Sequence, residues 1–364
     1  MGSKRARSTP SARVLLVGQG SVGQVCAHAL ERAHVEVHAL VRPPHAEVVS
    51  RGRLLRQLRL LSAADSQRLT GLVTHTSPDT LRAIRFDHVL LTMPSTDLRG
   101  AWFGFLVEAI KDAPLTMLQP GPMDRAYVLE HLPARRLIQG LIGFIAFSSP
   151  SPDAQASATE LDATAFWYPP LSASLLDGPR AHTSHLVSLL EQGGMPVRTK
   201  RKLAVRAAMA TAVLTPFLIG LELEGWDFKR LRSTGRLFDV SHAEREALDL
   251  MATHHGVRRP TTGALLQAGV LSMITGAAPI ATPFELEAYL RAHFTKVGDQ
   301  TQDIAATYLE LAASLDHPMP HMRSMLSELR KLHAPESPED TPDEFHEDPR
   351  DEHEASGLKP PRPT

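Results

Sequence analysis

The chain has 364 residues, 43% of them hydrophobic, and its formal net charge at pH 7 is −1. A chain of this length can bury two ordinary cores, so the sequence favours two domains. Charge is concentrated at the two ends: residues 1–13 hold four basic groups and no acidic one, whereas residues 334–364 hold ten acidic groups against three basic ones. The body between them is nearly neutral, which excludes the basic surface typical of nucleic-acid-binding proteins.

Residues 1–12 are a short basic head that lacks the apolar segment of a signal peptide, so we expect a cytoplasmic protein. Cys26 is the only cysteine, which excludes an intramolecular disulfide and leaves a small residue that we expect to be buried. The 18 histidines raise the question of a metal site. Because no cysteine partner accompanies them in a zinc-binding pattern, we expect no metal.

The first predicted strand ends in a glycine-rich turn. Apolar residues 14–17 predict a buried strand, and a GxGxxG pattern follows where a helix begins, at Ser21. In such a turn Gly18 makes the tight bend, Gly20 lets the backbone approach a pyrophosphate, and Gly23 lets the helix pack closely on the strand. We therefore expect a bound dinucleotide, held by Gly18, Gln19, Gly20, Ser21, Val22 and Gly23.

A second predicted strand, residues 35–41, ends at Arg42, which lies 19 residues after Gly23. An NAD-selective site has an acidic residue here to accept from the ribose hydroxyls, whereas an arginine suits the 2′-phosphate of NADP(H). Arg42 therefore predicts NADP(H), with a solvated charge at the end of a strand as the alternative. The same reasoning disfavours a methyltransferase, which would need an acidic ligand for the adenosine ribose.

Strands are also predicted at residues 71–75, 87–92 and 115–118, with a helix at 98–111 and strand-like runs at 136–147 and 163–176. This alternation indicates an α/β Rossmann domain, built on a doubly wound parallel sheet, at residues 13–197. Helical periodicity replaces it at residues 198–333 and predicts an all-α C-terminal domain. The expected helices of that domain span residues 202–221, 243–255, 262–273, 283–293, 301–314 and 320–332.

Two further segments limit the partners. The uncharged stretch 207–221 is shorter than the roughly 20 residues of a membrane span and contains Pro216, so we expect a buried core helix and no membrane. Residues 334–364 are acidic and Pro-rich, without apolar periodicity, and are predicted to be a disordered tail. The sequence names no partner for this tail, and it is compatible with a homodimer without specifying one.

The order of a Rossmann domain and an all-α domain resembles the ketopantoate reductase (2-dehydropantoate 2-reductase) family over roughly residues 13–333. Residues 118–121, Leu-Gln-Pro-Gly, are similar to the family's LQNG segment, which places Pro120 at the cofactor; residues 201–206 resemble its W-x-K-L-x-x-N helix. The resemblance implies NADPH as cofactor and a 2-keto acid as substrate. It also implies that Lys202 stabilises and protonates the developing alkoxide. A surface lysine within a basic run is the alternative for Lys202.

Several positions depart from the family's pattern. Pro120, Arg206 and Ala210 stand where the family has asparagines, and an ungapped match puts Ala288 and Gln300 at its serine and glutamate. One hypothesis is a changed substrate. Arg206, one helical turn beyond the lysine, would then hold a carboxylate bidentately, and Gln300 would suit a substrate without the ketopantoate hydroxyl. The other hypothesis is an inactive NADPH-binding sensor or scaffold. The sequence favours the first, an NADPH-dependent reduction of a 2-keto acid to a 2-hydroxy acid.

Overall fold

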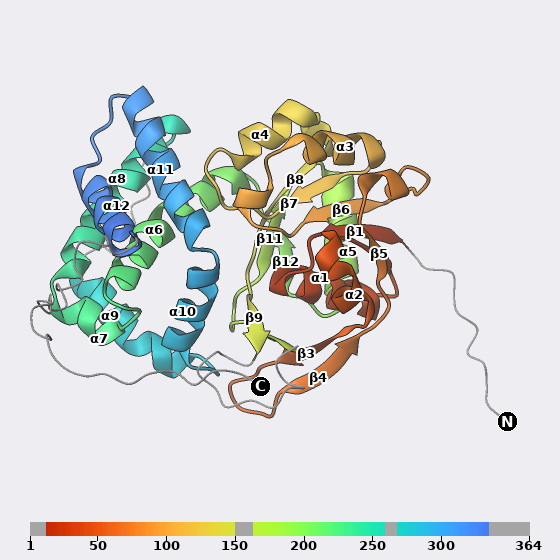
Figure 1. Cartoon of the computed structure of the whole chain (residues 1–364), viewed down its shortest axis with the longest axis horizontal. Coiled ribbons are helices and arrows are strands. Elements are labelled where there is room, and N and C mark those ends of the chain that lie inside the picture. Colours follow the sequence, from red (N-terminus) through yellow and green to blue (C-terminus); the bar gives the residue numbers. More distant parts are fainter. Residues whose placement is uncertain (1–11, 150–162, 259–267, 335–364) are drawn as a thin grey trace, which may run out of the picture.

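The computed structural model describes residues 12–149, 163–258 and 268–334. It contains an N-terminal α/β domain and a C-terminal helical domain that lie side by side (Figure 1). The expected Rossmann domain followed by an all-α domain is therefore confirmed. The basic head, except for its last residue, and the acidic tail, except for its first, lie outside the described residues.

Among the described residues, the main sheet has eight strands in the order β12-β11-β8-β7-β6-β1-β2-β5. The strands from β8 to β5 run parallel to one another, whereas β11 and β12 run in the opposite direction. The strands are β1 (Arg13–Val17), β2 (Glu36–Leu40), β5 (Val73–His75), β6 (His88–Leu91), β7 (Leu115–Met117), β8 (Leu137–Leu141), β11 (Ser174–Asp177) and β12 (Val197–Thr199).

Helices cover both faces of this sheet, because its central strands alternate side chains into two separate cores. Val14 and Leu16 of β1 join one apolar cluster with α1 and α5, whereas Leu15 and Val17 join another with α3 and α4. Cys26 of α1 is buried in the first cluster as expected, and burial raises the pKa of its thiol to about 12. The helices are α1 (Ser21–Arg32), α2 (Pro43–Ser50), α3 (Ala101–Ala109), α4 (Asp124–His131) and α5 (Arg180–Gln192), with short 3-10 turns η1 (Pro78–Leu81), η2 (Ser95–Asp97) and η3 (Ala134–Arg136).

A second sheet, with the order β4-β3-β10-β9, corrects the expected strand pattern. Each of the runs 136–147 and 163–176 is two strands, one in each sheet. The chain can cross between sheets at Gly143 because its backbone lies against that of Ala173, where a Cβ would be 2.2 Å from the carbonyl carbon. The hairpin β3–β4 was not expected from the sequence, and neither were α2, α5, α7 and β12. The strands of this sheet are β3 (Arg53–Gln57), β4 (Asp65–Leu69), β9 (Ile145–Ser149) and β10 (Ala163–Trp167).

The helical domain is built around α6, which packs against α8 and α12. Length and composition alone would allow α6, with a mean hydropathy of 1.7, to cross a membrane, but half of its apolar window is buried inside the protein. Part of the expected helix 262–273 lies outside the described residues. The helices are α6 (Leu203–Leu223), α7 (Phe228–Ser233), α8 (Arg236–His254), α9 (Ala268–Ala277), α10 (Leu286–Lys296), α11 (Gly298–Ser314) and α12 (Pro320–Leu332), with a 3-10 turn η5 (Ala278–Ala281).

The core of the helical domain contains a carboxyl group. Glu244 of α8 is fully buried, and neither of its carboxylate oxygens has a hydrogen-bond partner among the described residues. Burial disfavours the charged form and raises the pKa of Glu244 to about 8. Glu244 is therefore mostly protonated at neutral pH in the folded protein.

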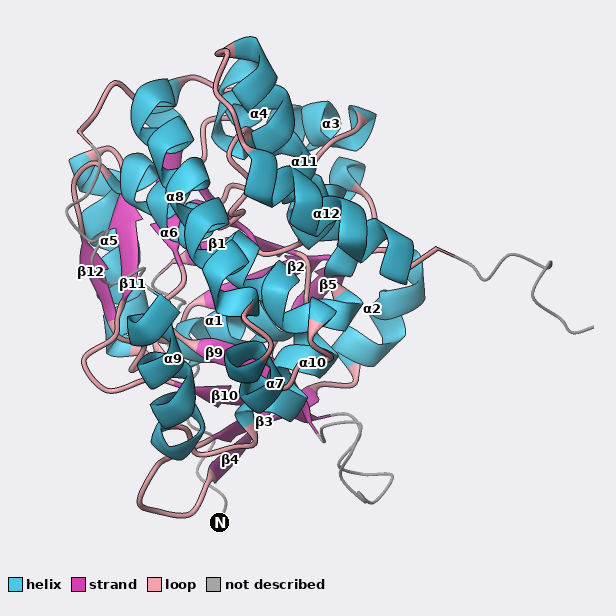
Figure 2. Cartoon of the chain, turned by 90° about the vertical axis from the view of Figure 1, so that its left-hand side faces the viewer, coloured by secondary structure: helices cyan, strands magenta, loops and turns pink. Residues whose placement is uncertain are grey.

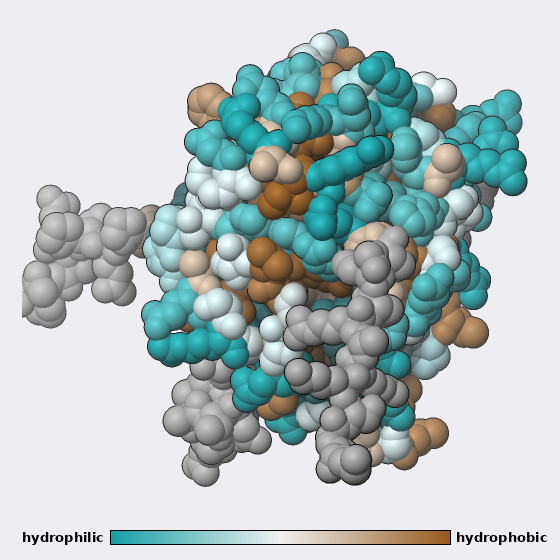
Figure 3. All heavy atoms as spheres, turned by 90° about the vertical axis from the view of Figure 1, so that its right-hand side faces the viewer, coloured by the Kyte–Doolittle hydropathy of each residue, from teal (hydrophilic) through white to brown (hydrophobic). Residues whose placement is uncertain are grey.

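The two domains meet along α6, α10 and α11 of the helical domain. Gln300, in the first turn of α11, contacts the loop after β6, and Tyr289 of α10 packs its ring against Phe147 of the second sheet. Figure 2 shows α10 in front of this sheet. The opposite, outer face of the N-terminal domain is mostly hydrophilic, with small hydrophobic areas (Figure 3).

Candidate functional site

The glycine turn has the backbone geometry that the sequence predicts. Gly18 follows β1 with φ of +93°, a conformation that favours glycine, and its N–H donates to the Leu40 carbonyl at 2.9 Å. A Cβ on Gly23 would lie 2.6 Å from the Gly18 carbonyl oxygen and 2.8 Å from Thr92 Oγ1. Gly23 is thus required for close packing of α1 on the sheet. Thr92 fixes the same place by donating to the Gly18 carbonyl at 2.8 Å.

Gly20 differs from the other two glycines because a Cβ built on it meets nothing within 4 Å. It lies at the N-terminus of α1, where unpaired backbone N–H groups and the helix dipole attract an anion. Ser21 and Val22 form the first turn of the helix. The side-chain amide of Gln19 has no hydrogen-bond partner among the described residues, and an unpartnered polar group of this kind calls for a ligand or water. The turn therefore fits the diphosphate of a dinucleotide.

Arg42 lies in the connection between β2 and α2, where it is the N-terminal cap residue of α2. β2 is the neighbour of β1, the strand that leads into the glycine turn. Its side chain is 73% exposed, and its guanidinium lies 4.0 Å from a carboxylate oxygen of Asp97. The structure therefore places Arg42 where the sequence expects it, at the carboxyl end of β2. It also adds an acidic neighbour that the sequence did not indicate.

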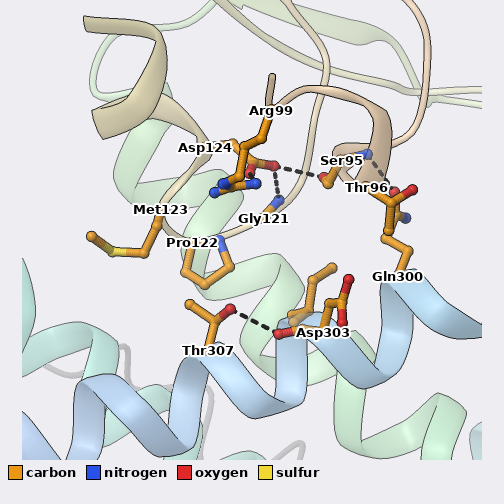
Figure 4. A pocket seen from close by; sticks show the side chains of 11 residues that line it. Ser95, Thr96, Arg99, Gly121, Pro122, Met123, Asp124, Gln300, Asp303 and Thr307 are labelled. Atoms are coloured by element: carbon orange, nitrogen blue, oxygen red, sulfur yellow. Dashed lines mark hydrogen bonds and ion pairs between the residues drawn. The ribbon is translucent and has the colours of Figure 1, made fainter. Parts of the chain in front are cut away.

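A small hollow lies between the two domains, where the loops after β6 and β7 face α11 (Figure 4). The hollow lies near the carboxyl ends of the parallel strands β6 and β7, and ligands usually bind at this end of such sheets. Its lining residues are mostly polar: Ser95, Thr96, Arg99, Gly121, Pro122, Met123, Asp124, Gln300, Asp303, Ile304 and Thr307.

Asp124 organises one wall of the hollow, and its side chain is almost completely buried. Its carboxylate accepts from Ser95 Oγ at 2.6 Å, from the Gly121 N–H at 2.9 Å and from the Arg99 guanidinium at 3.0 Å. Arg99 is half exposed and also lies over the ring of Tyr127, 5.4 Å from its centroid. A buried carboxylate needs such partners, so this network fixes the loops after β6 and β7 relative to each other.

Sequence reasoning missed Ser95, Arg99 and Asp124. The available signal was local: an aspartate three residues after Gly121, at the start of α4, resembles a residue that caps the N-terminus of a helix. Nothing in the sequence indicated that Arg99 and Ser95, 25 and 29 residues away from Asp124, would bind the same carboxylate.

Gln300 and Pro120 both lie at the contact between the domains. The Gln300 side-chain oxygen accepts from the Ser95 N–H at 2.8 Å, so this amide bridges α11 to the N-terminal domain and borders the hollow. Pro120 has no side-chain donor, but its carbonyl accepts from Thr211 Oγ1 of α6 at 3.2 Å. Ala210 is exposed on α6, and Ala288 lies on α10, partly exposed.

Lys202 and Arg206 lie together at the start of α6, outside the lining of the hollow. Lys202 is the N-terminal cap rather than a helical residue. Its φ of +59° is left-handed, and the next residue, Leu203, donates its N–H to Asp177 at 3.0 Å. Both basic side chains are exposed, and neither has an ion-pair or hydrogen-bond partner among the described residues. Lys202 and Arg206 are thus four residues apart at the start of α6, and neither lines the hollow that Gln300 borders.

The family model described as ketopantoate reductase PanE/ApbA matches residues 14–166. A 2-dehydropantoate 2-reductase from Geobacter metallireducens GS-15 is 15% identical and has a TM-score of 0.66, covering 88% of this chain and 99% of that chain. A PanE/ApbA family ketopantoate reductase from Ralstonia eutropha JMP134 is 17% identical and has a TM-score of 0.67, covering 88% and 98%.

A structure of D-mandelate dehydrogenase with NADH and anilino(oxo)acetate is 10% identical and has a TM-score of 0.64, covering 88% of this chain and 97% of that chain. No curated protein matches the chain by sequence. All three similar structures are named as oxidoreductases, and at these identities they establish the shared fold. Residues 14–166 therefore match the ketopantoate reductase family model, and the chain has the fold of the 2-dehydropantoate 2-reductases.

Proposed function

We propose that the protein is an NADP(H)-dependent oxidoreductase that reduces a 2-keto acid to a 2-hydroxy acid between its two domains. The observation that carries this proposal is Gly20, which faces open space at the N-terminus of α1 in a turn of the ketopantoate reductase family. The bound dinucleotide would supply a hydride. The D-mandelate dehydrogenase structure, whose ligand is an oxoacetate, supports a 2-keto acid as the class of substrate.

In this proposal the cofactor is held mainly by backbone. The turn from Gly18 to Gly23 offers N–H groups to the diphosphate, and Arg42 offers a guanidinium to the 2′-phosphate. Pro120 would border the nicotinamide half, since it lies in the loop after β7 and contacts α6. These contacts bind and orient the cofactor without taking part in proton transfer.

Lys202 is proposed as the proton donor and Arg206 as the ligand of the substrate carboxylate. The role of Lys202 rests on the family resemblance, and the structure supports it by leaving its ammonium group without a competing partner among the described residues. Arg206 lies in the first turn of α6, four residues after Lys202, so the same end of the helix carries both cations. Because neither side chain lines the hollow, the reacting carbonyl would lie on the α6 side of it, with the rest of the substrate inside.

The charges of the hollow limit what that remaining part can be. Arg99 is already paired with Asp124, and Asp303 adds a further negative charge, so the lining is negative overall. A second carboxylate would be repelled there. Gln300 and Thr307 instead offer uncharged polar groups, so a neutral, polar substrate end is proposed.

The test is to measure NADPH binding and then NADPH oxidation with a panel of 2-keto acids that differ in the length and polarity of the side chain. Oxidation that depends on a monocarboxylic keto acid supports the proposal. NADPH binding without any oxidation would instead identify a non-catalytic dinucleotide-binding protein. Absence of dinucleotide binding would reject the function altogether.

A further inference from the structure

The ion pair between Arg42 and Asp97 spans the glycine turn. Arg42 follows β2, and Asp97 ends η2, which follows β6. These two strands flank β1 on opposite sides in the sheet. Their side chains therefore meet across the carboxyl end of β1, where the glycine turn begins, with 4.0 Å between guanidinium nitrogen and carboxylate oxygen.

Asp97 occupies a position relevant to cofactor choice because it lies beside the arginine proposed to bind the 2′-phosphate. A phosphate group and the Asp97 carboxylate would compete for one guanidinium, and they would repel each other. A ribose with a free 2′-hydroxyl carries no such charge and can donate a hydrogen bond to the carboxylate. Arg42 thus favours binding of a 2′-phosphate, whereas Asp97 disfavours it.

We propose that Asp97 is a specificity-determining residue that weakens binding of the 2′-phosphate and narrows the preference for NADP(H) over NAD(H). The inference rests on the proposed dinucleotide-binding function. The Arg42 and Asp97 side chains are 73% and 42% exposed, so the pair is a solvated one. Pairs of this kind contribute about 0.2–1 kcal/mol, which corresponds to a change in affinity of about 1.4- to 5-fold.

The test compares Asp97→Asn with the unmodified protein. Asparagine keeps the size of the side chain and removes its charge. Adenosine 2′,5′-diphosphate and adenosine 5′-monophosphate are the probes, since they differ only in the 2′-phosphate, and NADPH and NADH are measured in parallel by calorimetry. The matched control is Asp112→Asn, which removes an exposed carboxylate from the loop before β7. This loop lies at the amino ends of the parallel strands, whereas Asp97 lies at their carboxyl ends.

Asp97→Asn is expected to tighten the binding of adenosine 2′,5′-diphosphate and NADPH about two- to fivefold, while the binding of adenosine 5′-monophosphate and NADH is unchanged or weaker. This gain in affinity should become smaller as the salt concentration is raised, and Asp112→Asn should not change the affinities. Equal effects of Asp97→Asn on both probes, or no effect, would overturn the role of Asp97 while leaving dinucleotide binding intact. If none of the four ligands binds the unmodified protein, the proposed function fails and this inference fails with it.

Discussion

The two halves of the candidate site are built by different means. The cofactor half is made of backbone: a left-handed glycine, a glycine with open space above it and a helix N-terminus, all within residues 18–23. The substrate half is made of side chains from the two segments that follow β6 and β7 and from α11, joined by the Asp124 carboxylate and the Gln300 amide. A backbone site tolerates changes in neighbouring side chains, whereas a side-chain site changes with each substitution. Loss of the family's polar residues in the substrate half is therefore compatible with an unchanged cofactor half.

The sharpest test of this difference is Lys202→Met. If Lys202 is the proton donor, turnover should fall about 10²–10⁴-fold while NADPH affinity changes little, because the backbone half is untouched. Lys200→Met is the matched control, since Lys200 is an exposed lysine in the same basic run. Steady-state kinetics and cofactor titration of both variants measure the effect. Similar turnover in the two variants would remove Lys202 from the mechanism.

Arg42 is the side chain of the cofactor half that is proposed to bind the 2′-phosphate. We expect the unmodified protein to bind NADPH at least about tenfold more tightly than NADH, because a charge-assisted bond to the 2′-phosphate contributes roughly 1.5–3 kcal/mol. Arg42→Ala should erase that preference by weakening NADPH alone. Equal affinities for the two cofactors in the unmodified protein would contradict the assignment of Arg42.

Gly20 and Gly23 separate binding from stability within the same turn. Gly23→Ala places a Cβ 2.6 Å from the Gly18 carbonyl oxygen and should cost about 1–3 kcal/mol of unfolding free energy. Gly20→Ala has open space and an unstrained φ of −68°, so stability should hold while dinucleotide affinity falls. Thermal melts and cofactor titration check both. Comparable destabilisation by the two changes would show that the turn is only a packing device.

The stability of the helical domain can be probed through Glu244. Its pKa is about 8 in the folded protein, against 4.5 as the ordinary value, so the folded state holds a proton that the unfolded state releases. The contribution of Glu244 to the free energy of unfolding is therefore fully present below pH 4.5 and is lost as the pH rises towards 8. Glu244→Gln should therefore gain about 1 kcal/mol or more over the unmodified protein between pH 6 and 9, measured by urea unfolding. A difference that does not depend on pH would contradict the raised pKa.

The smallest effect is expected from removing residues 334–364. An acidic, Pro-rich segment contributes little buried apolar surface, so the melting temperature and the NADPH affinity should stay almost unchanged. Melting curves and cofactor titrations of the truncated chain test this. A melting temperature lower by several degrees would mean that the tail docks on one of the two domains.

The sequence alone determined the features that depend on short stretches of chain. The strand, GxGxxG turn and helix at residues 13–32, and the change from α/β to all-α near residue 200, follow from local backbone preferences and from periodicity. Runs 136–147 and 163–176 were read as strands, but their division between two sheets was missed, since a change of sheet depends on how distant backbones meet at Gly143.

Tertiary structure alone decided which side chains share a site. Ser95 and Gln300 are 205 residues apart, yet a 2.8 Å hydrogen bond joins them, and no local pattern records that contact. Arg42 indicated the 2′-phosphate by its position after a strand, but its carboxylate neighbour Asp97 lies in η2, which follows a strand two places away in the sheet. Backbone geometry is set by neighbouring residues, whereas the charge around a ligand is set by every element that reaches it. The sequence therefore predicted where a cofactor would bind better than how selectively it would bind.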